Sequence, residues 1–95
     1  MQNHKEVSES KTILVICLDG KTTTTELQKL FKPYGRIVEV GIKEFVVDDG
    51  RNPVTATVTF TNSNAATMAI LGRDGVDFHG RSIHVSLLRG EPNDF

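Results

Sequence analysis

The sequence predicts an α+β domain in which two helices pack on one face of a four-stranded antiparallel sheet. Residues 54–60 alternate small or apolar side chains with threonines, as a half-buried strand does, and an alanine-rich helical segment follows at 65–71. A second helical pattern at about 24–32 lies between strand-sized apolar segments at 12–18 and 37–46. A last strand opens at Arg81, which completes the order β-α-β-β-α-β.

The first expected strand, 12–18, is the most apolar run of the chain. Its period of two directs Ile13 and Val15 to the core and Leu14 and Ile16 to the opposite face. Cys17 is the only cysteine, and its place in this run indicates a buried, reduced thiol.

The first expected helix has start and stop signals of its own. Thr23 and Glu26 have the spacing of a capping box, and Pro33 and Gly35 end the helix. Its buried side is marked by spacings of three and four residues: Leu27, Leu30, Phe31 and Tyr34.

The remaining strands follow from the same periodicity. In the second, the spacing from Ile37 to Val40 indicates a bulge, and Gly41, Lys43 and Phe45 point away from the core. Residues 48–53 are dense in turn formers and form the next loop. We expect these side chains to be mostly buried: Ile13, Val15, Leu27, Leu30, Phe31, Ile37, Ile42, Ala56, Val58, Phe60, Ala66, Ala69, Ile70, Ile83 and Val85.

Composition argues against several classes of protein. The net charge of −1 gives no general attraction to nucleic acid, so any such contact requires a local patch. No apolar run approaches the length of a membrane span, and the N-terminus lacks the pattern of a signal peptide, which favours an intracellular place, in nucleus or cytoplasm. No motif for catalysis, for a metal or for a cofactor is present, and we expect none of these.

The passage Phe31-x-x-Tyr34-Gly35-x-Ile37 resembles the end of helix one and the start of strand two in RNA recognition motif (RRM) domains. Residues 56–60 match the core positions of that family's third-strand signature, and Ile13, Val15 and Leu18 match its first-strand signature. The resemblance covers residues 11–89 and implies a ferredoxin-like fold, with a flexible tail at 1–10 and a C-terminal tail at 90–95.

The resemblance implies a non-enzymatic module that contacts single-stranded RNA on its sheet. The aromatic side chains on which RRM domains stack bases are replaced here by Leu14, Thr55 and Thr57, so the contact with RNA should be weak or atypical. Lys11 at the start of the first strand is a further possible contact. The candidate binding residues lie on the sheet face and loops: Leu14, Ile16, Lys43, Phe45, Arg51, Thr55, Thr57, His84 and Arg89.

An alternative is a protein-interaction module built on the same fold. Leu14 and Ile16, with Phe45 beside them, would form an aliphatic patch suited to an apolar peptide or helix. Such a patch is expected either to lie under the segment after Leu88 or to dock a protein partner.

Overall fold

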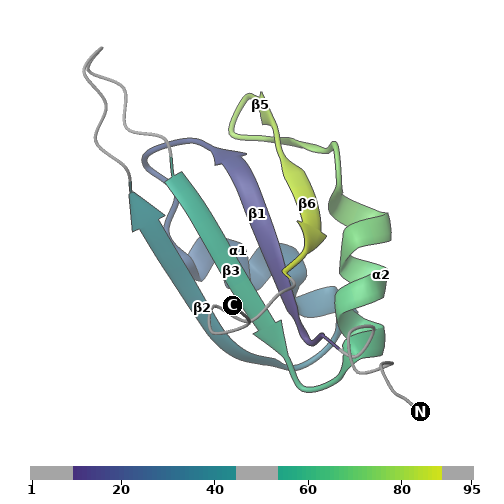
Figure 1. Ribbon diagram of the computed structural model, residues 1–95. Coiled ribbons are helices and arrows are strands. Elements are labelled where there is room, and N and C mark those ends of the chain that lie inside the picture. Colours follow the sequence, from purple (N-terminus) through teal and green to yellow (C-terminus); the bar gives the residue numbers. More distant parts are fainter. Residues whose placement is uncertain (1–9, 45–53, 89–95) are drawn as a thin grey trace, which may run out of the picture.

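The computed structural model describes residues 10–44 and 54–88, and for Glu44 the backbone alone. Four strands form one antiparallel sheet in the order β2-β3-β1-β6, and β4 and β5 form a separate two-stranded ribbon. Figure 1 shows α1 behind the sheet and α2 at the right beside β6, and no helix crosses the front face. The elements are β1 (Thr12–Leu18), α1 (Thr24–Phe31), the 3₁₀ helix η2 (Lys32–Tyr34), β2 (Ile37–Glu44), β3 (Val54–Phe60), α2 (Ser63–Arg73), β4 (Asp77–Phe78), β5 (Arg81–Ser82) and β6 (His84–Leu87).

The core lies between the sheet and the helices, as the alternation of apolar residues predicts. Val54, Ala56, Val58 and Phe60 are all buried, and the threonines between them are only half-buried. Most residues expected in the core are buried there, whereas Leu30, Ile37, Ile42 and Ile70 are partly buried and pack against it. Within the described ranges, no helix has the length and hydropathy needed to span a membrane.

The prediction for Cys17 is wrong, because a bulge interrupts β1. Val15 pairs with Ala56 but Leu18 pairs with Val54, so β1 has one residue more than β3 in this interval. Cys17 takes the extra position with a left-handed φ of 69° and is exposed, and Leu18 becomes the buried residue. The bulge predicted in β2 is present, between Ile37 and Glu39.

Helix α1 begins as predicted. The Glu26 backbone N–H donates to the Thr23 hydroxyl over 3.2 Å, and the Glu26 carboxylate accepts from the Thr23 N–H over 3.0 Å. At the other end, η2 leads into a turn at Gly35, which lies against Ala65 of α2. Tyr34 occupies the space beside Gly72, where a Cβ atom would overlap its ring.

The last strand is divided, which the sequence did not indicate. Asp77 pairs with Ser82 and Phe78 with Arg81, so His79 and Gly80 form a two-residue hairpin turn with φ of 57° and 80°. Positive φ at both positions is typical of the turn that matches the twist of a hairpin. The strand that pairs with β1 starts only at His84.

Candidate functional site

The face of the sheet opposite the helices is built from alternate residues of four strands. Its central row consists of neighbours across the sheet: Gly41 is paired with Thr57, Thr57 with Leu14, and Leu14 with Ser86. Because the side-chain period of a strand is two, the residues two positions away along each strand share this face. Leu14 and Thr57 are half-buried, so both present part of their surface to solvent.

On one side of the central row, a second row combines a cation with hydroxyl and aliphatic groups. Lys43 pairs with Thr55 on the β2 side, and Ile16 pairs with His84 on the β6 side. The Lys43 side chain is exposed, and Lys43 also interacts with another part of the protein. Ile16, like Leu14, is half-buried.

On the other side of the central row, hydroxyl groups make hydrogen bonds between neighbouring strands. The Thr12 and Thr59 hydroxyls are 2.9 Å apart and share a hydrogen bond. Ser10 donates its hydroxyl proton to the Leu88 carbonyl over 2.7 Å, which joins the start of β1 to the end of β6. Lys11, which lies between Ser10 and Thr12 in the sequence, is exposed.

His84 turns toward the edge of the sheet and Asp74, at the C-terminal end of α2. The His84 Nδ1 atom lies 2.8 Å from the Asp74 carboxylate, an ion pair when the imidazole is protonated. The same carboxylate oxygen accepts the Val85 N–H over 2.9 Å, and this hydrogen bond is the main cause that lowers the pKa of Asp74. The His84 side chain therefore contacts the Asp74 carboxylate at the edge of the open sheet face.

The open face brings together Leu14, Ile16, Lys43, Thr55 and Thr57, five of the residues named from the sequence. Phe45, Arg51 and Arg89 lie outside the described residues, as does the segment after Leu88 that was expected over the patch. In the part of the face that the structure describes there is no Phe, Tyr or Trp. The available chemistry is hydrogen bonding by hydroxyls, one ammonium group and aliphatic contact.

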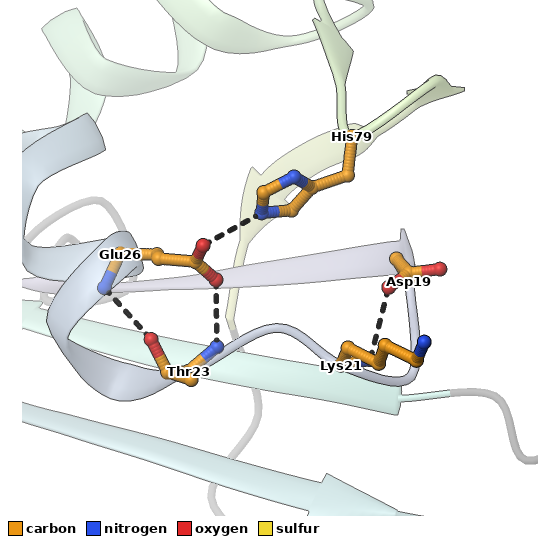
Figure 2. Close-up of polar contacts among 5 residues, drawn as sticks. All are labelled: Asp19, Lys21, Thr23, Glu26 and His79. Atoms are coloured by element: carbon orange, nitrogen blue, oxygen red, sulfur yellow. Dashed lines mark hydrogen bonds and ion pairs between the residues drawn. The ribbon is translucent and has the colours of Figure 1, made fainter.

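A second polar cluster joins the start of α1 to the β4–β5 ribbon (Figure 2). His79 Nε2 lies 3.0 Å from the free oxygen of Glu26, whose other oxygen accepts the Thr23 N–H. The hydrogen bond from the Thr23 backbone, followed by that from His79, lowers the pKa of Glu26. The capping-box spacing predicted the roles of Thr23 and Glu26, but no pattern in the sequence indicated the hairpin that carries His79.

The contacts of this cluster join the β4–β5 ribbon and the turn after β1 to the start of α1. Asp19 accepts the Lys21 N–H over 3.0 Å in the adjoining turn, which shapes the approach to α1. Among the described residues, no group of three or more potential ligands is arranged for a metal ion. The open sheet face, which brings together residues named from the sequence, is the candidate functional site.

Comparison with known proteins identifies relatives of this chain. The family model described as "RNA recognition motif" matches residues 13–84. The chain is 39% identical over 83 residues to a protein named "Probable splicing factor, arginine/serine-rich 3" from Caenorhabditis elegans, covering 87% of this chain and 30% of that protein. It is 38% identical over 81 residues to "Serine/arginine-rich splicing factor SR34B" from Arabidopsis thaliana, covering 85% of this chain and 28% of the relative. The chain thus spans less than a third of either relative.

A solved structure has the same fold. The structure of the "RRM3 Domain of Mip6" superimposes with a TM-score of 0.75 and 30% identity, over 88% of this chain and 99% of that domain. This agreement extends across the sheet and both helices, and it confirms the predicted ferredoxin-like arrangement of the described residues.

Proposed function

Because this chain belongs to the RNA recognition motif family, we propose that it is a non-enzymatic module that binds single-stranded RNA on its open sheet face. Leu14, Ile16, Lys43, Thr55 and Thr57 supply the central contacts. Phe45, Arg51, His84 and Arg89 contribute from the strand ends and loops. The setting is RNA processing, in nucleus or cytoplasm, which the relatives named as splicing factors support.

The observation that carries this proposal is the composition of the open face. Side chains of Leu14, Thr55 and Thr57 project from the two central strands, where they can meet an extended strand of nucleotides. Threonine hydroxyls donate and accept hydrogen bonds, so they suit the polar edges of unpaired bases and the ribose 2′-hydroxyl. Lys43 at the β2 side adds a positive charge for a phosphate.

The same composition makes the binding weak. Each base stacked on an aromatic side chain contributes about 1–3 kcal/mol, and the aliphatic and hydroxyl groups here provide no such platform. Two missing stacks reduce affinity by about one to four orders of magnitude. We therefore expect dissociation constants nearer to the high micromolar range than to the nanomolar range.

Titration of the ¹⁵N-labelled chain with short, mixed-sequence RNA at low salt tests the proposal. Shifts should concentrate on β1 and β3, and Thr55→Val with Thr57→Val should weaken binding severalfold while keeping strand propensity. Thr67→Val, on the exposed side of α2, is the matched control and should bind as the parent does. Absence of shifts on β1 and β3 at millimolar RNA would refute the proposal.

A protein-interaction module remains the second candidate, favoured by the half-buried aliphatic pair Leu14 and Ile16. Leu14→Glu places a charge among apolar groups of the face but leaves the core intact, since the side chain points away from it. Loss of association with a protein partner, with RNA shifts unchanged, would favour this candidate. Loss of the RNA shifts would favour the first.

A further inference from the structure

A second candidate site lies at the α1–β2 turn, away from the open face. An open hollow of about 530 Å³ is lined by Gln28 from α1, Lys32 from η2, and the turn residues Gly35, Arg36 and Ile37. This volume is within the range of about 300–1,000 Å³ that ligand pockets occupy. The hollow lies beside the edge strand β2, since the sheet order places β2 at one end.

The turn that forms the hollow is held in place by backbone contacts. The Gly35 N–H donates to the Lys32 carbonyl over 3.2 Å, and the Arg36 carbonyl accepts the Thr61 N–H over 3.1 Å. Gly35 also lies against Ala65 of α2. The backbone of Lys32 and Arg36 is therefore largely fixed before any ligand binds, so the entropic cost of binding is limited to ordering the side chains.

The lining of the hollow is positively charged in a chain whose net charge is −1. Lys32 and Arg36 are exposed, and within the described ranges neither side chain is paired with a carboxylate. A lysine at the end of a helix is commonly explained by the helix dipole, and that suffices for Lys32. It does not account for Arg36, which lies beyond the end of η2.

We infer that this hollow binds an acidic, extended peptide segment of a partner protein. Lys32 and Arg36 pair with carboxylates, and Gln28 offers an amide to the peptide backbone. The half-buried Ile37 and the neighbouring Val38, which is 63% exposed, receive apolar side chains of the same segment.

The position beside a sheet edge favours a peptide over RNA. An apolar rim formed by Ile37 and Val38 suits alternating acidic and apolar side chains. The outer side of β2 has no neighbour in the described sheet, so its backbone groups are placed to pair with another extended chain. The site is therefore separate from the RNA-binding face and serves a different partner.

The test uses the 95-residue chain and a blocked eight-residue peptide in which glutamate and valine alternate. Amide shifts should appear at Gln28, Lys32, Arg36 and Ile37. A peptide that alternates lysine and valine should produce none of them. Lys32→Gln and Arg36→Gln should each weaken binding by about two- to fivefold, as expected for exposed ion pairs. Lys21→Gln removes one exposed lysine elsewhere and should change the affinity less than 1.5-fold, which is about 0.2 kcal/mol.

Three results would overturn the inference. The first is the absence of shifts at the hollow with millimolar glutamate peptide and low salt. The second is an equal loss of affinity in Lys21→Gln and the two hollow variants, which would indicate general charge attraction. The third is a set of hollow shifts produced by an RNA octamer and not by the peptide. Circular dichroism melts of the variants, unchanged from the parent, show that loss of binding does not come from unfolding.

Discussion

Thr57 occupies the centre of the open face, with Gly41 on one side and Leu14 on the other. Because Gly41 has no side chain, a larger group at position 57 has room toward β2. Thr57→Tyr should therefore supply a stacking surface and raise RNA affinity about thirtyfold, at the middle of the range for one stacked base. Fluorescence anisotropy with a labelled RNA octamer measures this, and Thr67→Tyr on α2 is the control. Equal affinities for the two variants would show that the face is not the binding surface.

Glycine is required at the η2–β2 turn because of how closely the chain approaches α2. A Cβ atom at Gly35 would lie 2.7 Å from the Ala65 Cβ, and neither atom can move without its backbone. Gly35→Ala should lower the free energy of unfolding by about 2–3 kcal/mol, through overpacking added to the strain of a side chain at its φ of +157°. Gly80→Ala is the comparison: its φ is +80° and nothing lies within 4 Å, so backbone strain alone should cost about 1 kcal/mol. Urea denaturation of both variants measures the difference, and an equal loss would contradict the packing argument.

At the scale of elements, two carboxylates join helix ends to strands, and both depend on pH. Hydrogen bonds lower the pKa of Glu26 at the start of α1 and of Asp74 at the end of α2 from their ordinary values of 4.5 and 3.8. A carboxylate whose pKa is lower when folded stabilises the fold above its ordinary pKa, and this contribution is lost as the pH falls through the folded value. Acidification should therefore loosen the Glu26 junction below about pH 4.5 and the Asp74 junction below about pH 3.8.

Glu26→Gln tests this linkage. The variant lacks the titrating group, so its melting temperature should fall less than that of the parent between pH 5 and pH 3. Glu39→Gln removes an exposed carboxylate from β2 and should follow the parent. Thermal melts by circular dichroism at each pH measure both. Parallel curves for the parent and Glu26→Gln would show that the capping box and the contact with His79 contribute nothing to the acid response.

Elements whose signals are local in sequence could be predicted, and those that depend on distant contacts could not. The alternation of Val54, Ala56 and Val58 with threonines defined the register of β3, and Thr23 with Glu26 defined the start of α1. The bulge at Cys17 arises from its pairing with β3, which no local pattern in β1 indicates. His79 and Glu26 meet only because the β4–β5 ribbon folds toward α1, so their contact had no signal in either segment.

Which side chains of β1 and β3 reach the open face was predicted, because this depends on the period of two within each strand. Leu14 was expected to face outward, and its place between Thr57 and Ser86 follows once β1 lies between β3 and β6. The direction of His84 was not predictable, because Asp74 reaches it from the end of α2. The hollow at Lys32 and Arg36 was also missed, since a concave surface is a property of packed elements and leaves no periodic pattern.

At the scale of the whole molecule, a net charge of −1 leaves RNA binding to depend on a few local cations, whose number should determine how binding responds to salt. For single-stranded nucleic acid, the slope of log K against log salt is about −0.7 for each phosphate neutralised. The cations proposed around the open face are Lys11, Lys43, Arg51 and Arg89, so one to four contacts give a slope between about −0.7 and −3. Lys43→Gln should reduce the magnitude of the slope by about 0.7, whereas Lys32→Gln at the hollow should leave it unchanged. Titrations between 50 and 300 mM salt measure these slopes.

A slope steeper than about −4 would require cations beyond the open face. If Lys32→Gln reduced the magnitude of that slope, RNA would continue around the β2 edge into the hollow. In that event the two sites would form one nucleic-acid surface, and the acidic peptide would compete with RNA for Arg36.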